Sequence, residues 1–161
     1  MTSDDPHDPS PARVTADADV LAADLLIGDP ARAALDHVRE HSWMTLVASE
    51  DLLDDAEAVV RTLGDETLAR DWRTRAATAS ERVAHPAADH PALASAYRGG
   101  AMHLLTFDES LLSASAGAAI SGRVETSVRH PRAFATLFDA ESLYRAVVGG
   151  EYPGPDRDPR I

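Results

Sequence analysis

The sequence of 161 residues contains no cysteine and no lysine, and aromatic residues make up only 5% of it. Without cysteine, the chain has no disulfides, thiolate metal sites or cysteine nucleophiles. Without lysine, a Walker A phosphate loop, Schiff-base chemistry and a response-regulator receiver are excluded. No apolar run reaches the length of a membrane span, and the acidic N-terminus has no hydrophobic signal region. We therefore expect a cytoplasmic protein with no membrane partner.

Acidic residues are the most abundant feature of the sequence. Eighteen aspartates and nine glutamates exceed fifteen arginines and give a net charge of −12. An Asp-rich, Lys-free composition rich in Ala and Arg is typical of extreme halophiles, in which acidity maintains solubility. It predicts a halophilic archaeal source. Because molar salt screens repulsion to within a few Å, such a protein can still bind nucleic acid.

Strands and helices alternate along the chain, between flexible tails expected at residues 1–12 and 149–161. The predicted strands are Arg13–Ala18, Trp43–Ala48, Met102–Phe107 and Val124–Val128. The predicted helices are Val20–Ile27, Ala31–His41 after an Asp29-Pro30 start, Ser49–Leu63, Glu66–Val83, Asp89–Tyr97, Asp108–Ala118, Pro131–Phe138 and Glu141–Val148. The alternation predicts one α/β domain over residues 13–148, a three-layer α/β/α sandwich with a mostly parallel central sheet.

Several aspartates fall where the predicted strands end or the next helices begin. They are Asp17 and Asp19 after the first strand, Asp54 and Asp55 in the helix after the second, Asp89 before the third strand and Asp108 after it. Functional groups of parallel sheets collect beyond the C-terminal strand ends. Clustered carboxylates need raised pKa values or bound cations, and an all-oxygen site suits Mg²⁺ or Mn²⁺. Helix capping is the competing interpretation for Asp19, Asp89 and Asp108.

Two segments in the first half resemble the PIN-domain nucleases. Ala16–Leu21 is similar to the family's Asp-Thr-Asn-x-Leu opening, which puts Asp17 on the first metal ligand. Ser49–Asp55 resembles the helix that carries the second acid, and its spacing from the serine gives that role to Asp55.

Two further segments extend the resemblance from about Val14 to Phe138. In the family, an acid opens a helix of small residues, Gly-Gly-Ala ends it, and a strand runs into Thr-x-Asp. The segment from Asp89 to Asp108 is similar, with Gly99-Gly100-Ala101 and Thr106-Phe107-Asp108. Val128–Phe134 resembles the closing strand and Pro-x-x-Phe helix.

The resemblance implies a metal-dependent endoribonuclease, similar to VapC-type toxins, that hydrolyses RNA phosphodiester bonds. It implies Mg²⁺ or Mn²⁺ held by catalytic Asp17, Asp55, Asp89 and Asp108, with Asp19 and Asp54 in support. It also implies RNA as substrate, a homodimer, and an antitoxin protein as partner. Met102 and Ser110 stand where the family often has acids. An alternative therefore stays open, a PIN-like binding or assembly module that no longer cuts.

Other motifs carry weaker hypotheses. The stretch from His37 to His41 reads H-x-x-E-H, the inverted zinc-protease pattern, with both histidines on one helix face. The sequence has no G-x-S-x-G elbow for serine hydrolysis. His90 and His103 flank the proposed site, where a structural role competes with contact to RNA or metal. The candidate phosphate-binding arginines are Arg98, Arg123, Arg129 and Arg132, although no dense basic stripe exists.

Overall fold

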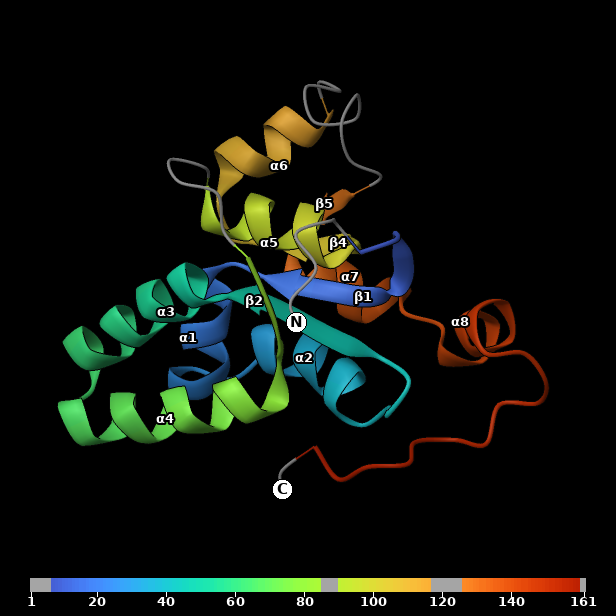
Figure 1. Ribbon diagram of the computed structural model, residues 1–161, viewed down its shortest axis with the longest axis horizontal. Coiled ribbons are helices and arrows are strands. Elements are labelled where there is room, and N and C mark those ends of the chain that lie inside the picture. Colours follow the sequence, from blue (N-terminus) through green and yellow to red (C-terminus); the bar gives the residue numbers. More distant parts are fainter. Residues whose placement is uncertain (1–6, 85–89, 117–125, 160–161) are drawn as a thin grey trace.

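The computed structural model describes residues 7–84, 90–116 and 126–159, and within them a parallel sheet is flanked by helices (Figure 1). The elements are β1 (Ser10–Ala16), α1 (Ala18–Leu26), α2 (Ala31–Arg39), β2 (Thr45–Ser49), α3 (Glu50–Leu63), α4 (Glu66–Ala79), β3 (Glu81–Val83), α5 (Pro91–Gly99), β4 (Ala101–Leu105), α6 (Glu109–Ala116), β5 (Ser127–Arg129), α7 (Pro131–Leu137) and α8 (Ala140–Val147). The fold is the three-layer α/β/α sandwich that the sequence predicts.

The sheet has five strands in the order β3-β2-β1-β4-β5, and every neighbouring pair is parallel. From β1 the chain adds β2 and β3 on one side, then crosses back to add β4 and β5 on the other. The order therefore reverses between β1 and β4. In open parallel sheets, the crevice at such a reversal, beyond the C-terminal strand ends, is the usual place for a ligand.

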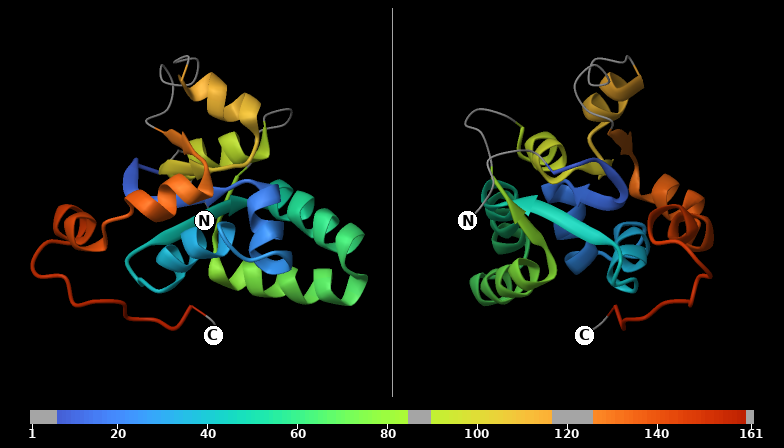
Figure 2. Two further views of the ribbon diagram at one scale, coloured as in Figure 1. Left: turned by 180° about the vertical axis from the view of Figure 1, so that it is seen from behind. Right: turned by 45° about the vertical axis from the view of Figure 1, so that its right-hand side comes forward.

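Helices cover both faces of this sheet. Helix α5 contacts β1, β2 and β4 on one face, whereas α1, α2, α3, α4 and α7 pack against one another on the other (Figures 1 and 2). The central strands contribute fully buried aliphatic side chains, including Val14, Val47 and Leu104. Continuous apolar strands are expected where a parallel sheet is covered on both faces.

Two glycines shape the connection from α5 to β4. Gly100 caps α5 in the left-handed conformation with φ of 64°, which an L side chain rarely adopts. A Cβ on Gly99 would lie 2.7 Å from Cγ2 of Val47 in β2, so only glycine lets α5 approach the sheet this closely. The Gly-Gly pair thus sets both the end of the helix and its packing.

Two sequence predictions of local structure are wrong. The predicted helix Glu66–Val83 ends at Ala79, and Glu81–Val83 forms β3 instead, because pairing with β2 and an ion pair from buried Arg13 to Glu81 hold that segment in the sheet. The predicted Asp29 cap is absent, since α2 begins at Ala31 without a side-chain cap. In the first case tertiary pairing overrides local helix preference.

The segment after α8 lies along the connection between α2 and β2. Tyr152 places its hydroxyl 2.5 Å from Nε2 of buried His41. The backbone N–H of Asp156 donates to Glu40 O across 2.9 Å, and Oδ1 of Asp156 accepts from Ser42 N across 2.7 Å. The sheet starts earlier than residue 13, because β1 begins at Ser10. Residues assigned to tails from composition therefore make specific contacts.

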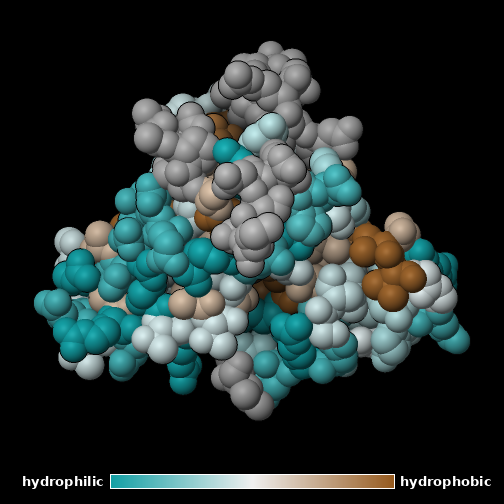
Figure 3. Space-filling model, in the orientation of Figure 1, coloured by the Kyte–Doolittle hydropathy of each residue, from teal (hydrophilic) through white to brown (hydrophobic). Residues whose placement is uncertain are grey.

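Hydrophobic residues are unevenly distributed over the surface. Figure 3 shows a hydrophobic patch near α8, where Val147 and Val148 are exposed. No helix in the described part of the chain is long and apolar enough to cross a membrane.

Candidate functional site at the acidic sheet edge

One buried hydroxyl joins two of the predicted site aspartates. Asp17 follows β1 and Asp108 follows β4, the two strands on either side of the reversal in strand order. Oγ1 of Thr106, a residue with no exposed surface, donates to Asp17 Oδ2 across 2.9 Å. The same oxygen accepts from the backbone N–H of Asp108 across 3.0 Å. The structure thus brings Asp17 and Asp108 to one edge of the sheet.

Asp17 is also the N-cap of α1. Its Oδ1 accepts from Ala18 N across 2.8 Å, and its own N–H donates to Leu105 O across 2.8 Å. A carboxylate at a helix N-terminus is stabilised by the helix dipole. The side chain is only partly buried, and with one accepted bond on each oxygen, both oxygens keep further lone pairs.

Asp108 caps α6 through a single oxygen. Its Oδ1 accepts from the N–H and the hydroxyl of Ser110, each across 2.8 Å, and more weakly from Leu111 N across 3.4 Å. The pKa of Asp108 is held below its usual value, mainly by the hydrogen bond from the Ser110 hydroxyl and next by the one from the Ser110 amide. The charge interaction with His90 lowers this pKa further. Asp108 is therefore ionised at neutral pH. No residue of the described segments donates to its Oδ2.

The acids of α3 divide between two sides of the helix. Asp54 is paired with Arg73, Nη1 to Oδ1 across 2.6 Å, and Glu50 is bound by both Arg73 and Arg82. Asp54, expected to support a metal, instead joins α3 to α4. Asp55 is exposed and makes no hydrogen bond or ion pair with the part of the chain that the structure describes.

The four predicted acids are not all brought together. Over residues 7–84, 90–116 and 126–159, no group of three or more His, Cys, Asp or Glu side chains has the geometry to hold a metal ion. Asp55 therefore does not complete a three-carboxylate set with Asp17 and Asp108. Asp19 is exposed in the first turn of α1, one residue beyond Ala18. Asp89 lies outside the described residues.

The two histidines near the edge, His90 and His103, make different contacts. His103 lies within β4, its ring 5.4 Å from that of Phe134, and burial first and Arg129 second lower its pKa. It is therefore neutral at neutral pH. His90 is the N-cap of α5, and its Nδ1 accepts from Ala92 N across 3.2 Å.

The inverted zinc-protease pattern forms no metal site in the described structure. Both ring nitrogens of His41 are engaged, Nδ1 with His37 O at 2.6 Å and Nε2 with Tyr152. The His37 ring stacks on Phe138 with centroids 4.4 Å apart. These two histidines pack against aromatic side chains, His37 against Phe138 and His41 against Trp43 and Phe138.

The candidate phosphate-binding arginines are spread over several elements. Arg129 ends β5 beside Leu105, and Arg132 is exposed in the first turn of α7. Arg98 lies in the last turn of α5, toward the opposite edge of the sheet. Arg123 lies outside the described residues. Among the candidates that the structure describes, Arg129 and Arg132 therefore lie at the strand ends where Asp17 and Asp108 lie, and Arg98 does not.

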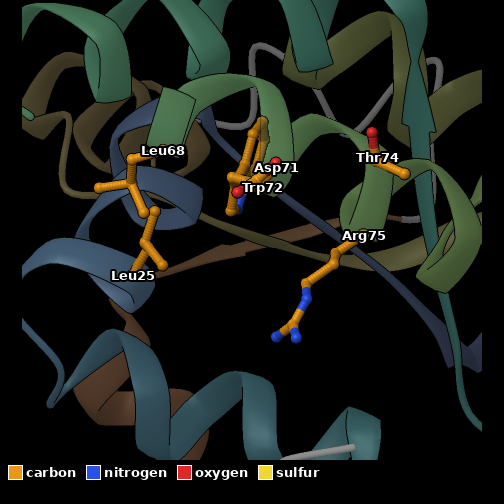
Figure 4. A pocket seen from close by; sticks show the side chains of 6 residues that line it. All are labelled: Leu25, Leu68, Asp71, Trp72, Thr74 and Arg75. Carbon is orange, nitrogen blue, oxygen red and sulfur yellow. The ribbon is translucent and has the colours of Figure 1, made fainter. Parts of the chain in front are cut away.

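A surface hollow lies away from these acids. Leu25 of α1 lines it together with residues of α4, which are Leu68, Asp71, Trp72, Thr74 and Arg75 (Figure 4). Helix α1 starts at the acidic edge and runs away from it, so Leu25 is about 12 Å from Asp17 along the helix axis. The hollow contains none of the predicted site residues.

Sequence reasoning missed one feature of this edge. The rings of Phe107 and His130 meet with centroids 5.1 Å apart and planes at 71°. Phe107 stands between the two residues of the Thr-x-Asp motif, and His130 precedes Pro131. An aromatic residue beside a site aspartate was the available signal. Its partner His130 follows β5, and the sequence does not show that β5 lies beside β4.

Residues 8–160 match a protein family described as a family of unknown function, DUF7384, and the chain therefore belongs to that family. No curated protein and no solved structure matches the chain.

Proposed function

We propose that this protein is a PIN-like, metal-dependent endoribonuclease whose site is formed by Asp17 and Asp108, with Asp89 as a further ligand. Asp55, an exposed side chain, would join the ion only after a change in its conformation. The observation that carries the proposal is the Thr106 hydroxyl, which bonds both to Asp17 and to the backbone of Asp108 at the reversal in strand order. A buried hydroxyl shared by two acidic residues at a ligand-binding edge supports a preorganised polar site better than isolated helix caps.

The donor set fits Mg²⁺ or Mn²⁺. These hard cations prefer oxygen ligands, and Mg²⁺ is commonly held by one or two carboxylates together with water and substrate phosphate. Asp108 is ionised and concentrates its helix-capping bonds on Oδ1. Asp17 keeps a partly exposed carboxylate. These two side chains would hold the ion, which when bound supplies Lewis-acid catalysis for phosphate-ester hydrolysis.

The remaining residues position these carboxylates. Thr106 fixes one oxygen of Asp17, and the N-terminus of α1 stabilises its negative charge. Ser110 holds Asp108 in its rotamer and keeps it ionised. Arg73 of α4 neutralises Asp54, which leaves Asp55 as the α3 acid without such a partner among the described residues.

One observation favours the second candidate, a PIN-like binding module that does not cut. The described segments contain no set of three acids that can hold a metal. In that case Asp17 and Asp108 act only as helix caps, and their replacement changes stability but no catalytic rate.

RNA cleavage separates the two candidates. We expect the native protein to cleave single-stranded RNA in molar KCl with Mg²⁺ or Mn²⁺, and EDTA to abolish the reaction. Asp17→Asn and Asp108→Asn should each reduce the rate by at least about a hundredfold, a loss of roughly 2.7 kcal/mol of transition-state stabilisation.

Asp139→Asn is the matched control. Asp139 caps α8, accepts from the N–H and hydroxyl of Ser142 and has its pKa lowered chiefly by that hydroxyl, as Asp108 does with Ser110. It lies outside the acidic edge. Equal activity of the native protein and all three variants, or metal-independent activity, would overturn the proposed site.

A further inference from the structure

The aromatic pair at the acidic edge consists of Phe107 and His130. Phe107 follows buried Thr106 and precedes Asp108, so its position is fixed by the same turn that presents the carboxylate. Both side chains are partly exposed. The pair also spans two strand ends, since Thr106 N donates to the carbonyl of Arg129 across 3.0 Å, immediately before His130.

The two rings do not stack face to face. Their planes cross at 71° with centroids 5.1 Å apart, an edge-to-face arrangement. In such a pair, the ring that contributes its edge keeps both of its faces free of the other ring. Nδ1 of His130 accepts from Arg132 N across 3.1 Å, which fixes the histidine ring at the start of α7.

We propose that Phe107 and His130 form a base-stacking subsite for an unpaired RNA nucleotide next to Asp108. Every base has a π-face, so an aromatic platform binds single-stranded RNA with little sequence preference. The bases of a duplex are already stacked on each other and are not available to these rings. Arg132, exposed in the first turn of α7, supplies a cation for the phosphate that follows.

This inference deepens the proposed nuclease function, because it names unpaired RNA as the substrate class. Stacking would also suit RNA binding by a protein with net charge −12. Stacking is not opposed by the protein's charge, whereas phosphate contacts weaken as salt rises.

The variants can be chosen to preserve the fold. Phe107→Leu keeps an apolar side chain against the core but removes the ring. His130→Asn keeps a helix-capping side chain before Pro131 but removes its ring. Tyr97→Leu is the matched control, because Tyr97 is 45% exposed in the last turn of α5, toward the opposite edge of the sheet.

Binding is measured by fluorescence anisotropy of a labelled 12-nucleotide oligouridine in EDTA and about 1 M KCl, which limits electrostatic range to ~3 Å. The comparisons are an abasic ribose-phosphate oligomer of the same length and a duplex RNA. We expect Phe107→Leu and His130→Asn each to raise the Kd for oligouridine about tenfold, and Tyr97→Leu to leave it unchanged. The abasic oligomer and the duplex should bind at least tenfold more weakly than oligouridine.

Three results would overturn the subsite: no binding of oligouridine by the native protein, an unchanged Kd in both ring variants, or equal binding of the abasic oligomer. Because EDTA excludes metal-dependent cleavage, the result is independent of nuclease activity. Ring-dependent binding without any cleavage in Mg²⁺ or Mn²⁺ would reject the nuclease and keep the subsite. Cleavage in Mg²⁺ or Mn²⁺ together with binding that does not depend on the two rings would keep the nuclease and reject the subsite.

Discussion

The hydroxyl of Thr106 lies 2.9 Å from Oδ2 of Asp17, although the two residues are 89 positions apart in the chain. It also receives the N–H of Asp108, so one side chain satisfies partners at the ends of β1 and β4. Thr106 has no exposed surface, and water cannot replace either bond without a change in packing. The geometry of the acidic edge therefore depends on a single buried hydroxyl.

Thr106→Val tests this dependence, because valine has nearly the same shape but no hydroxyl. We expect the free energy of unfolding in urea to fall by about 1–3 kcal/mol, since two polar groups lose a buried partner. Thr106→Ser, which keeps the hydroxyl, should lose less. If the Thr106→Val protein is as stable as the native protein, the hydroxyl bridge contributes nothing to the stability of the fold.

The two neighbouring acids of α3 give a second prediction. Asp54→Asn should leave RNA cleavage near the native rate, because Asp54 is paired with Arg73. Asp55→Asn should slow cleavage by at least about tenfold, because Asp55 is the α3 acid proposed to reach the ion. Cleavage rates of the two variants are measured with saturating Mg²⁺. If Asp54→Asn cleaves more slowly than Asp55→Asn, Asp54 rather than Asp55 belongs to the metal site.

Gly99 gives a prediction about packing. Gly99→Ala should lower the free energy of unfolding by about 1–3 kcal/mol, because the added Cβ would lie 2.7 Å from Cγ2 of Val47. Val47→Ala makes room for it, so the double variant should lose less than the two single variants lose together. Additive losses in urea denaturation would mean that the two side chains do not collide.

The stability of the protein should depend on pH through Asp156, which lies in the segment after α8. Hydrogen bonds from the Ser42 hydroxyl and amide lower the pKa of Asp156 from its ordinary value of 3.8. The folded state thus favours the ionised carboxylate, and the resulting stability is complete above pH 3.8 and is lost as pH falls through the lowered pKa. Asp156→Ala should therefore be less stable than the native protein at pH 7.

The difference in stability between the native protein and Asp156→Ala should shrink as the pH falls below 3.8. Thermal unfolding of the native protein and of Asp156→Ala from pH 7 to pH 2.5 measures this difference. A stability difference that is constant over this pH range would show that the Asp156 carboxylate is not the group responsible.

Much of the fold follows from local signals in the sequence. Ser49, Gly64 and Gly100 end or begin helices where capping chemistry predicts, and the strand–helix alternation gives a parallel sheet. The strand β3 could not be found in this way. Glu81–Val83 continues a helix-like stretch, and only its pairing with β2 and the ion pair with Arg13 make it a strand.

The site was predictable where topology alone determines proximity. Asp17 and Asp108 each follow a strand on either side of the reversal, and the structure brings them to the same edge. The face of α3 on which each acid lies was harder to predict. Asp54 and Asp55 are neighbours in the sequence, but only Asp54 lies on the side of α3 that meets Arg73. The Phe107–His130 contact required knowledge that β5 lies beside β4.

The central claim is that Asp17 and Asp108 together hold one divalent ion. The most direct measurement is a Mn²⁺ titration followed by electron paramagnetic resonance, with the native protein, Asp17→Asn, Asp108→Asn and Asp139→Asn. We expect one saturable site in the native protein and in Asp139→Asn, and at least about tenfold weaker binding in Asp17→Asn and Asp108→Asn. Equal Mn²⁺ affinity in all four proteins would contradict it.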